Sequence, residues 1–234
     1  MVEKKGSREA PLFDFARADE HPSDVMRTRG GGATRTPPVP TLRDPDPGFG
    51  HHAPRWWGNW FIMLIEGAAF AALAVTYFYI WRNFDTWPPT ATLVPDLGVS
   101  TINVTVLVAS VLPMWHVARL ALRHDKPQVL GIWLLVCVLF GVSAAILRVM
   151  EFKAVHTRWD ANAYGTIVWA ILAVHFAHIL AATLETLVLV LLMFKGPVED
   201  RHYSDIAVNA VYWYFMALSW VAFYLIVFLA PRAI

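Results

Sequence analysis

The sequence from residue 166 to residue 194 reads TIVWAILAVHFAHILAATLETLVLVLLMF, and Glu185 is its one charged residue. An apolar helix of about 20 residues is long enough to cross the hydrocarbon core of a bilayer. Backbone groups exposed to lipid must form their hydrogen bonds within the segment, so a single stretch of this kind spans as a helix. The stretch therefore predicts a transmembrane helix.

Four further apolar stretches have a similar length. They occupy residues 57–81, 99–118, 129–148 and 206–229. The second of these is the most polar, and its small and hydroxyl side chains are typical of a helix that packs against other helices. The sequence predicts an all-α integral membrane bundle of five transmembrane helices over residues 56–234.

The overall composition agrees with a membrane protein. Hydrophobic residues make up 57% of the 234 residues, and the net charge is +1. A balanced charge argues against a nucleic-acid partner, which would need a concentrated basic surface. Cys137 is the only cysteine, which excludes an intrachain disulfide and a zinc site built from cysteines.

Residues 1–55 differ in character from the rest of the chain. They hold Gly30-Gly31-Gly32, five prolines between residues 37 and 47, and many charges. Such a segment buries too little apolar surface to offset its conformational entropy, so we expect a disordered extension. It lacks the apolar core of a secretory signal peptide, which predicts a cytoplasmic location. A docking tail and a solvated extension are both compatible with this composition.

Aromatic and basic residues predict the orientation of the helices. Trp56, Trp57, Trp60 and the run Tyr212-Trp213-Tyr214 are interpreted as markers of the membrane boundaries. Lysine and arginine are more numerous in the loops expected on the same side of the membrane as the start of the first span than in the loops on the opposite side. We therefore expect a multi-pass protein of the bacterial plasma (inner) membrane, with a cytoplasmic N-terminus and a periplasmic C-terminus.

Ionisable residues inside predicted spans require an explanation, because a central charge costs on the order of 3 kcal/mol on insertion scales. Glu66 has no basic residue within two turns, which predicts a neutral carboxyl or a bond to another helix. His175, His178 and Glu185 fall within about 80° of arc on one helix and form one polar stripe. Arg148 is predicted to pair with the acid three positions later, at the membrane interface.

The acid paired with Arg148 is Glu151.

The two histidines and Glu185 of the fourth span also raise the alternative of a metal site, since imidazole and carboxylate bind iron, copper and zinc. Carboxylate-bridged centres use Glu-x-x-His on several helices, and none of the predicted spans carries that motif. We expect an interhelical hydrogen-bonded stripe, no metal and no catalytic residue in this chain.

Several motifs resemble those of subunit III of cytochrome c oxidase and its quinol-oxidase relatives. They are Trp57-Gly58 followed by Glu66-Gly67-Ala68-Ala69-Phe70-Ala71, then Met150-Glu151-Phe152, then His175-Phe176-Ala177-His178, and the aromatic run Tyr212-Trp213-Tyr214-Phe215. The order and the spacing are similar to those of the family. The resemblance covers nearly everything after Trp56 and implies the five-helix form.

Two departures mark a divergent branch. The family's Trp-His-Phe-x-Asp is replaced here by Trp213-Tyr214-Phe215-Met216-Ala217, and the glycine between its two histidines is Ala177. Any role of the missing histidine and aspartate is therefore absent from this chain. Glu185 has no counterpart in the family's pattern.

The resemblance implies a companion subunit of a respiratory heme-copper oxidase. Such a subunit carries no cofactor, packs against the catalytic subunit I beside subunit II, holds membrane phospholipids, and supports proton uptake in an enzyme that reduces oxygen and translocates protons. Heme and copper are then expected in the partner subunits. By resemblance, Glu66, Glu151, His175 and His178 occupy the family's positions, with Glu66 and the two histidines expected to form one buried interhelical contact.

Two alternatives remain, one within respiration and one from a different class of protein. An accessory subunit of a nitric oxide reductase would have a similar small helical form. A stand-alone transporter or metal-dependent membrane enzyme would use Glu66, the two histidines and Glu185 around a polar cavity.

Overall fold

The structure is a computed structural model that describes residues 54–89 and 92–232. It contains the helices α2 (Pro54–Trp81), α3 (Leu97–Leu122), α4 (Pro127–Ala154), α5 (Ala163–Lys195) and α6 (Asp200–Tyr224). A π-helical turn at Leu225–Leu229 and a 3-10 turn at Ala230–Arg232 continue α6. All five helices are long and apolar enough to cross a membrane, so the prediction of a five-helix membrane bundle is confirmed.

The predicted disordered extension, residues 1–55, lies outside the described residues except for Pro54 and Arg55, which begin α2. The helices extend past the predicted spans at several ends. The α4 helix continues to Ala154 instead of ending at 148, and α6 begins at Asp200 instead of 206. Hydropathy detects only the part of a helix that lies in hydrocarbon, whereas polar turns continue into the interface.

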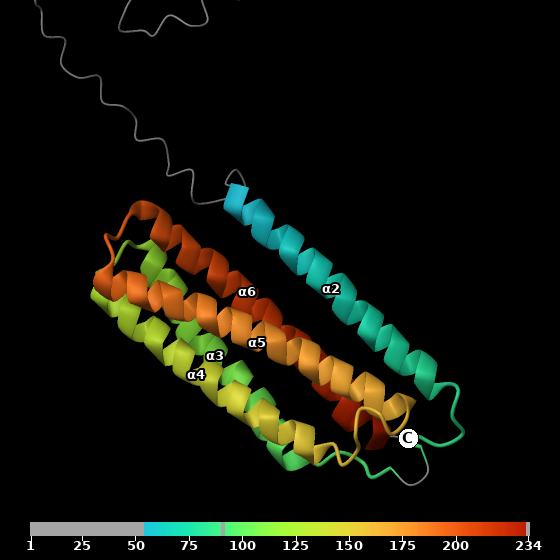
Figure 1. The fold of residues 1–234 in the computed structure, drawn as a ribbon. Helices are drawn as coiled ribbons and strands as arrows, with labels where there is room; N and C mark the ends of the chain where they lie inside the picture. The colour runs from blue at the N-terminus through green and yellow to red at the C-terminus, as the bar shows by residue number, and fades with distance from the viewer. Residues whose placement is uncertain (1–53, 90–91, 233–234) are drawn as a thin grey trace, which may run out of the picture. The chain divides into compact units, whose positions relative to one another are not determined.

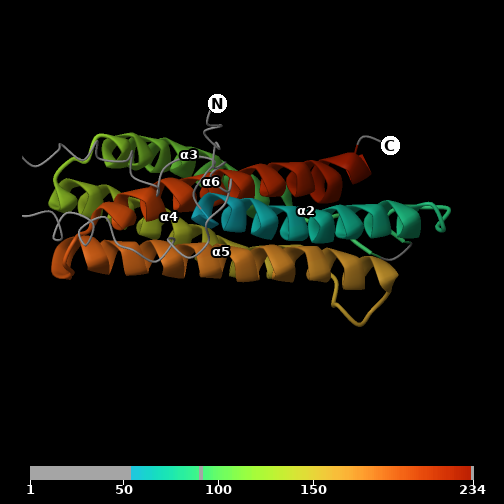
Figure 2. The same cartoon turned by 90° about the horizontal axis from the view of Figure 1, so that it is seen from above.

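Helices α3 to α6 form an up-and-down bundle, and α2 packs on α5 and α6 at its side (Figures 1 and 2). In this bundle α3 contacts α4 and α6, and α5 contacts the same two helices. We call the end that holds the start of α2 the Arg55 end, and the opposite end the Trp87 end. Successive helices run antiparallel between these two ends.

The α4 and α5 helices approach closely because small residues line their contact. A Cβ atom at Gly141 would lie 2.3 Å from Oγ1 of Thr183 and 3.1 Å from the Trp213 ring. Helices in lipid gain association energy from such close packing, because burial of apolar surface is not a driving force between them. Gly141 therefore sets the separation of these two helices.

Three polar residues of α3 face the protein, in agreement with the prediction that this helix packs against others, whereas Thr101 and Thr105 are exposed. Ser100, Asn103 and Ser110 are fully buried. The hydroxyl of Ser110 accepts a 2.8 Å hydrogen bond from Nε1 of Trp213 on α6. This bond places Trp213 inside the bundle, so the interpretation of that residue as a boundary marker is wrong.

The α2 helix is the least buried of the five. Its buried residues are Met63, Phe70 and Tyr77, spaced seven apart. Residues seven apart lie on one narrow face of a helix, so α2 contacts the bundle along a single stripe. At the Trp87 end the Tyr77 hydroxyl accepts a 2.9 Å hydrogen bond from Nε1 of Trp87.

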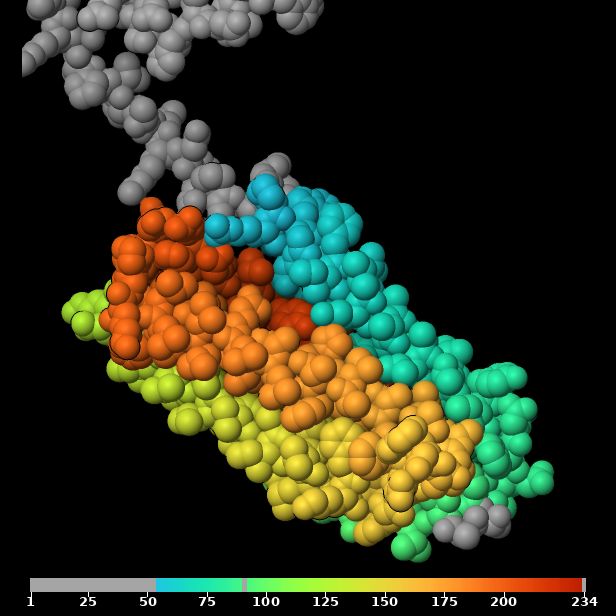
Figure 3. Space-filling model, viewed as in Figure 1, coloured from blue at the N-terminus to red at the C-terminus, as the bar shows by residue number. Residues whose placement is uncertain are grey.

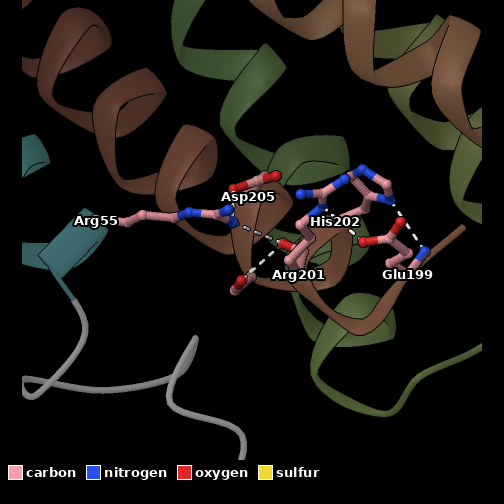
Figure 4. A network of polar contacts seen from close by, with 6 residues as sticks. Arg55, Glu199, Arg201, His202 and Asp205 are labelled. Atoms are coloured by element: carbon pink, nitrogen blue, oxygen red, sulfur yellow. Dashed lines mark hydrogen bonds and ion pairs between the residues drawn. The ribbon is translucent and has the colours of Figure 1, made fainter.

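The start of α2 is joined to the corner between α5 and α6 (Figure 4). Nη1 of Arg55 lies 2.6 Å from Oδ1 of Asp205 and donates to the carbonyl oxygen of Arg201 at 3.3 Å. At the corner itself, the backbone N–H of Glu199 donates to Nδ1 of His202 at 3.0 Å. The start of α2 is therefore tied to the first turns of α6 by polar contacts between segments distant in sequence.

Candidate functional site: two polar clusters between the helices

The first cluster is built around an ion pair on α4. Nη1 of Arg148 lies 2.5 Å from Oε2 of Glu151, and both side chains are completely buried. Asn103 of α3 donates a second hydrogen bond to the same oxygen at 2.9 Å. Helix α4 presents both residues to the bundle because residues three apart share a face.

The same arginine reaches α5 and α6. Nη2 of Arg148 lies 3.0 Å from Nδ1 of His175. Because arginine only donates, Nδ1 accepts, and Nε2 of His175 donates to the carbonyl oxygen of Met216 at 3.1 Å. The guanidinium carbon lies 3.3 Å from the centre of the Trp220 ring, which adds a cation–π contact. We call these residues the Arg148 cluster, and it ties α3, α4, α5 and α6 together.

The predicted pair between Arg148 and Glu151 forms, and the structure shows in addition that both side chains are buried inside the protein. The cause is that α4 continues to Ala154 and that Asn103 and Trp220 cover the pair from two neighbouring helices. A buried pair needs further contacts to compensate its desolvation. Asn103 on α3 and His175 on α5 supply hydrogen bonds and Trp220 on α6 supplies the cation–π contact, while Nε of Arg148 and Oε1 of Glu151 have no hydrogen-bond partner among the described residues.

The second cluster joins α2 to α5 and α6. The hydroxyl of Tyr212 donates to Oε1 of Glu66 at 3.1 Å. Nε2 of His178 lies 3.4 Å from the same oxygen, and Nδ1 of His178 donates to the carbonyl oxygen of Val174 at 2.6 Å. The ring of Phe70 packs 5.2 Å from that of His178 and shields the group. We call Glu66, His178 and Tyr212 the Glu66 cluster.

The predicted polar stripe on α5 is therefore divided. His175 points into the Arg148 cluster, and His178 points toward α2 and Glu66. A step of three residues turns a helix by about 60°, which is enough to aim two imidazoles at different neighbours. Glu185 joins neither cluster and lines a cleft with Arg55.

Sequence reasoning assigned no site role to three members of the clusters. They are Asn103, Trp220 and Tyr212. The sequence could have indicated Asn103 as a site residue, because a carboxamide within a span needs a hydrogen-bond partner. Tyr212 was interpreted as a boundary marker, and this was wrong because α6 begins at Asp200 and places Tyr212 well inside the span, where it is 8% exposed.

The geometry of both clusters suits helix cohesion and proton exchange better than metal binding. Both ring nitrogens of His175 are engaged, one by a cation and one by a carbonyl oxygen. Within residues 54–89 and 92–232, no three histidine, cysteine, aspartate or glutamate side chains are grouped as metal ligands. The Glu66 cluster, in contrast, holds a carboxyl, a phenol and an imidazole, which are groups that exchange protons.

Comparison with known proteins covers the same part of the chain. The family model described as cytochrome c oxidase subunit III matches residues 57–231. The chain is also similar to the cytochrome c oxidase subunit 3 of Schizophyllum commune, with 24% identity over 179 residues. That alignment covers 72% of this chain and 65% of the relative, so the chain spans less than two thirds of that protein's length. Because the family match includes both polar clusters and the membrane-spanning part of all five helices, this chain belongs to the cytochrome c oxidase subunit III family.

Proposed function

We propose that this chain is the non-catalytic subunit III of a respiratory heme-copper terminal oxidase. The observation that carries the proposal is the family match over residues 57–231, which includes every residue of the Arg148 and Glu66 clusters. In this role the chain stabilises catalytic subunit I, lies beside subunit II and membrane phospholipids, and supports proton uptake during oxygen reduction. Heme and copper belong to the partner subunits, and this chain supplies neither ligand nor catalytic group.

The two clusters have distinct parts in this proposal. The Arg148 cluster, with Glu151 and His175, holds four helices in register so that the bundle presents a rigid surface to its partner. The Glu66 cluster, with His178, is the proton-related contact. A buried hydrogen-bonded network of this kind rigidifies the elements that it joins.

The cellular setting is part of the same proposal. The protein is a multi-pass membrane protein, and we place it in the bacterial plasma membrane with a cytoplasmic N-terminus. The Arg55 end then faces the cytoplasm and the Trp87 end faces the periplasm. The excess of basic residues near the Arg55 end supports this orientation.

A gentle detergent pull-down of the tagged protein tests the function. We expect co-purifying oxidase subunits and reduced-minus-oxidised heme bands that disappear when the partner is stripped away. Co-purification with the catalytic subunit of a nitric oxide reductase would show instead that the chain is a subunit of that enzyme. A protein that purifies alone with stoichiometric iron, copper or zinc would contradict a companion role.

Replacement of Glu66 tests the role of its cluster. Glu66→Ala removes the acceptor of the Tyr212 hydroxyl and the partner of His178, so we expect weaker assembly or faster loss of activity during turnover. Ile65→Ala is the matched control, since the neighbouring side chain is 69% exposed on the outer face of α2. Unchanged assembly and unchanged sustained turnover in Glu66→Ala would argue against the proposed role.

A further inference from the structure

A cleft opens at the Arg55 end between α2, α5 and α6. Its volume is about 410 Å³, and Arg55, Ile62, Glu185, Asp205 and Tyr212 are among the residues that line it. Figure 3 shows it as a hollow between α2 and α5 with α6 at its floor. Each of these three helices contributes polar side chains to it, although the membrane-facing parts of the same helices are apolar.

The polar groups follow one another along the depth of the cleft. With a rise of 1.5 Å per residue, Asp205 lies about 8 Å from the start of α6, Glu185 about 15 Å from the end of α5, and Tyr212 about 18 Å from the start of α6. Arg55 and Asp205 pair at the mouth. The acids and the phenol thus form a series from the Arg55 end toward the middle of the bundle.

The floor of the cleft leads directly to the Glu66 cluster. The hydroxyl of Tyr212, which lines the cleft, donates to Oε1 of Glu66. Oε2 of Glu66 is buried, and no described residue donates a hydrogen bond to it. Glu185 also lines the cleft and is exposed there, in a span where a carboxyl needs a polar partner.

We propose that this cleft is a water-filled inlet that brings protons from the aqueous phase at the Arg55 end to the Glu66 cluster, with Glu185 holding the water chain midway. The space is large enough for several waters, each of which occupies about 30 Å³ in the liquid, and Asp205, Glu185 and Tyr212 place polar groups at successive depths of a lining whose surface is mostly apolar. Tyr212 passes the proton on: its hydroxyl gives a proton to the Glu66 carboxylate, which becomes neutral, while its oxygen takes a proton from a hydronium ion in the cleft, which becomes water.

Electrostatics favours this occupant. Glu185 and Asp205 face the cleft against a single cation, Arg55, so the cleft attracts protons and disfavours an anionic headgroup. The inference builds on the proposed proton-related role of Glu66. Its tests measure water and protonation within this chain, so they can fail while the pull-down still identifies an oxidase.

Cysteine accessibility tests the presence of water. In a Cys137→Ala background, we expect Ile62→Cys and Ala181→Cys, both in the cleft, to react with a charged, water-soluble thiol reagent in the purified complex in lipid nanodiscs. Ile65→Cys and Leu184→Cys are the matched controls, because they lie one turn further along the same helices and are exposed outside the cleft. We expect the cleft positions to react at least about tenfold faster, since charged reagents avoid hydrocarbon.

The same assay isolates Glu185. Glu185→Leu should lower the reaction rate at Ile62→Cys at least about tenfold, and Glu185→Gln should largely preserve it, because the amide still binds water. Equal rates at the cleft and control positions in the parent chain would show a dry cleft and overturn the inlet. If Glu185→Leu leaves the reaction rate at Ile62→Cys unchanged, Glu185 does not hold water in the proposed inlet.

Infrared spectroscopy after a rapid pH step tests the proton transfer. The carboxyl bands that vanish in Glu66→Gln report the protonation of Glu66. We expect these bands to respond in the parent complex and to respond at least about tenfold more slowly in Tyr212→Phe, which lacks the relaying hydroxyl. No response in the parent, or equal rates in Tyr212→Phe, would overturn the route through the cleft.

Discussion

Two histidines three residues apart on α5 are held in different states by their neighbours. Arg148 donates to Nδ1 of His175, which leaves the proton on Nε2, whereas the Val174 carbonyl oxygen requires a proton on Nδ1 of His178. We expect nitrogen-15 NMR of histidine-labelled protein to show an Nε2–H tautomer for His175 and a protonated Nδ1 for His178. His175→Gln and His178→Gln assign the signals. A protonated Nδ1 at His175 would contradict the hydrogen bonding described here.

The ion pair of the Arg148 cluster should show strong coupling between its two members. Arg148→Met leaves Glu151 buried without its cation, and breaking a buried pair in this way costs about 3 to 5 kcal/mol. We expect the double variant Arg148→Met, Glu151→Gln to be more stable than Arg148→Met alone, because the amide removes the uncompensated charge. Unfolding of the purified chain in detergent micelles measures Arg148→Met, Glu151→Gln and the double variant together with the parent. Additive losses would argue against the coupling.

The contact between α4 and α5 depends on the absence of a side chain at Gly141. Gly141→Ala would place a Cβ atom 2.3 Å from Oγ1 of Thr183, so either the helices separate or the threonine rotates out of its bond to Ile179. Overpacking of this kind costs about 1 to 3 kcal/mol. Gly58→Ala on α2 is the control, because its Cβ atom would meet nothing within 4 Å. We expect a lower unfolding temperature for Gly141→Ala and an unchanged one for Gly58→Ala.

At the level of elements, the sequence predicted the existence and the type of the five long helices that the structure describes, because an apolar run of this length spans lipid as a helix. It placed the ends less well. The polar turn that begins at Asp200 and the turn that ends at Ala154 are helical but not apolar enough for a hydropathy pattern to detect them. The late start predicted for α6 explains why Tyr212 was interpreted as a boundary marker.

Across the described part of the molecule, five spans place the start of α2 and the end of the last helix at opposite ends of the bundle. We expect a reporter that is active only in the cytoplasm to work when fused before Pro54, and a periplasmic reporter to work when fused after Arg232. The physical reasons are the odd number of crossings and the excess of basic residues near the Arg55 end. Activity of the same reporter at both ends would contradict five crossings.

The division of the polar residues into two clusters could not be predicted from the sequence. Periodicity gives the face of a helix on which His175, His178 and Glu185 lie, but it does not say which helix stands opposite. The assignment of partners depends on the order of helices around the bundle, in which α3 meets α6 and α2 lies outside against α5 and α6. That order brings Asn103 to Glu151 and Tyr212 to Glu66, and neither pair is close in sequence.

The narrow stripe by which α2 contacts the bundle has a consequence for biosynthesis. The ribosome completes α2 long before it makes α5 and α6, which supply His178 and Tyr212. During this interval Glu66 lies in the nascent chain without either partner, and helices in lipid gain nothing from apolar burial alone. A chain interrupted before α5 therefore carries an unpaired acid in its membrane segment, which distinguishes an unfinished subunit from a finished one.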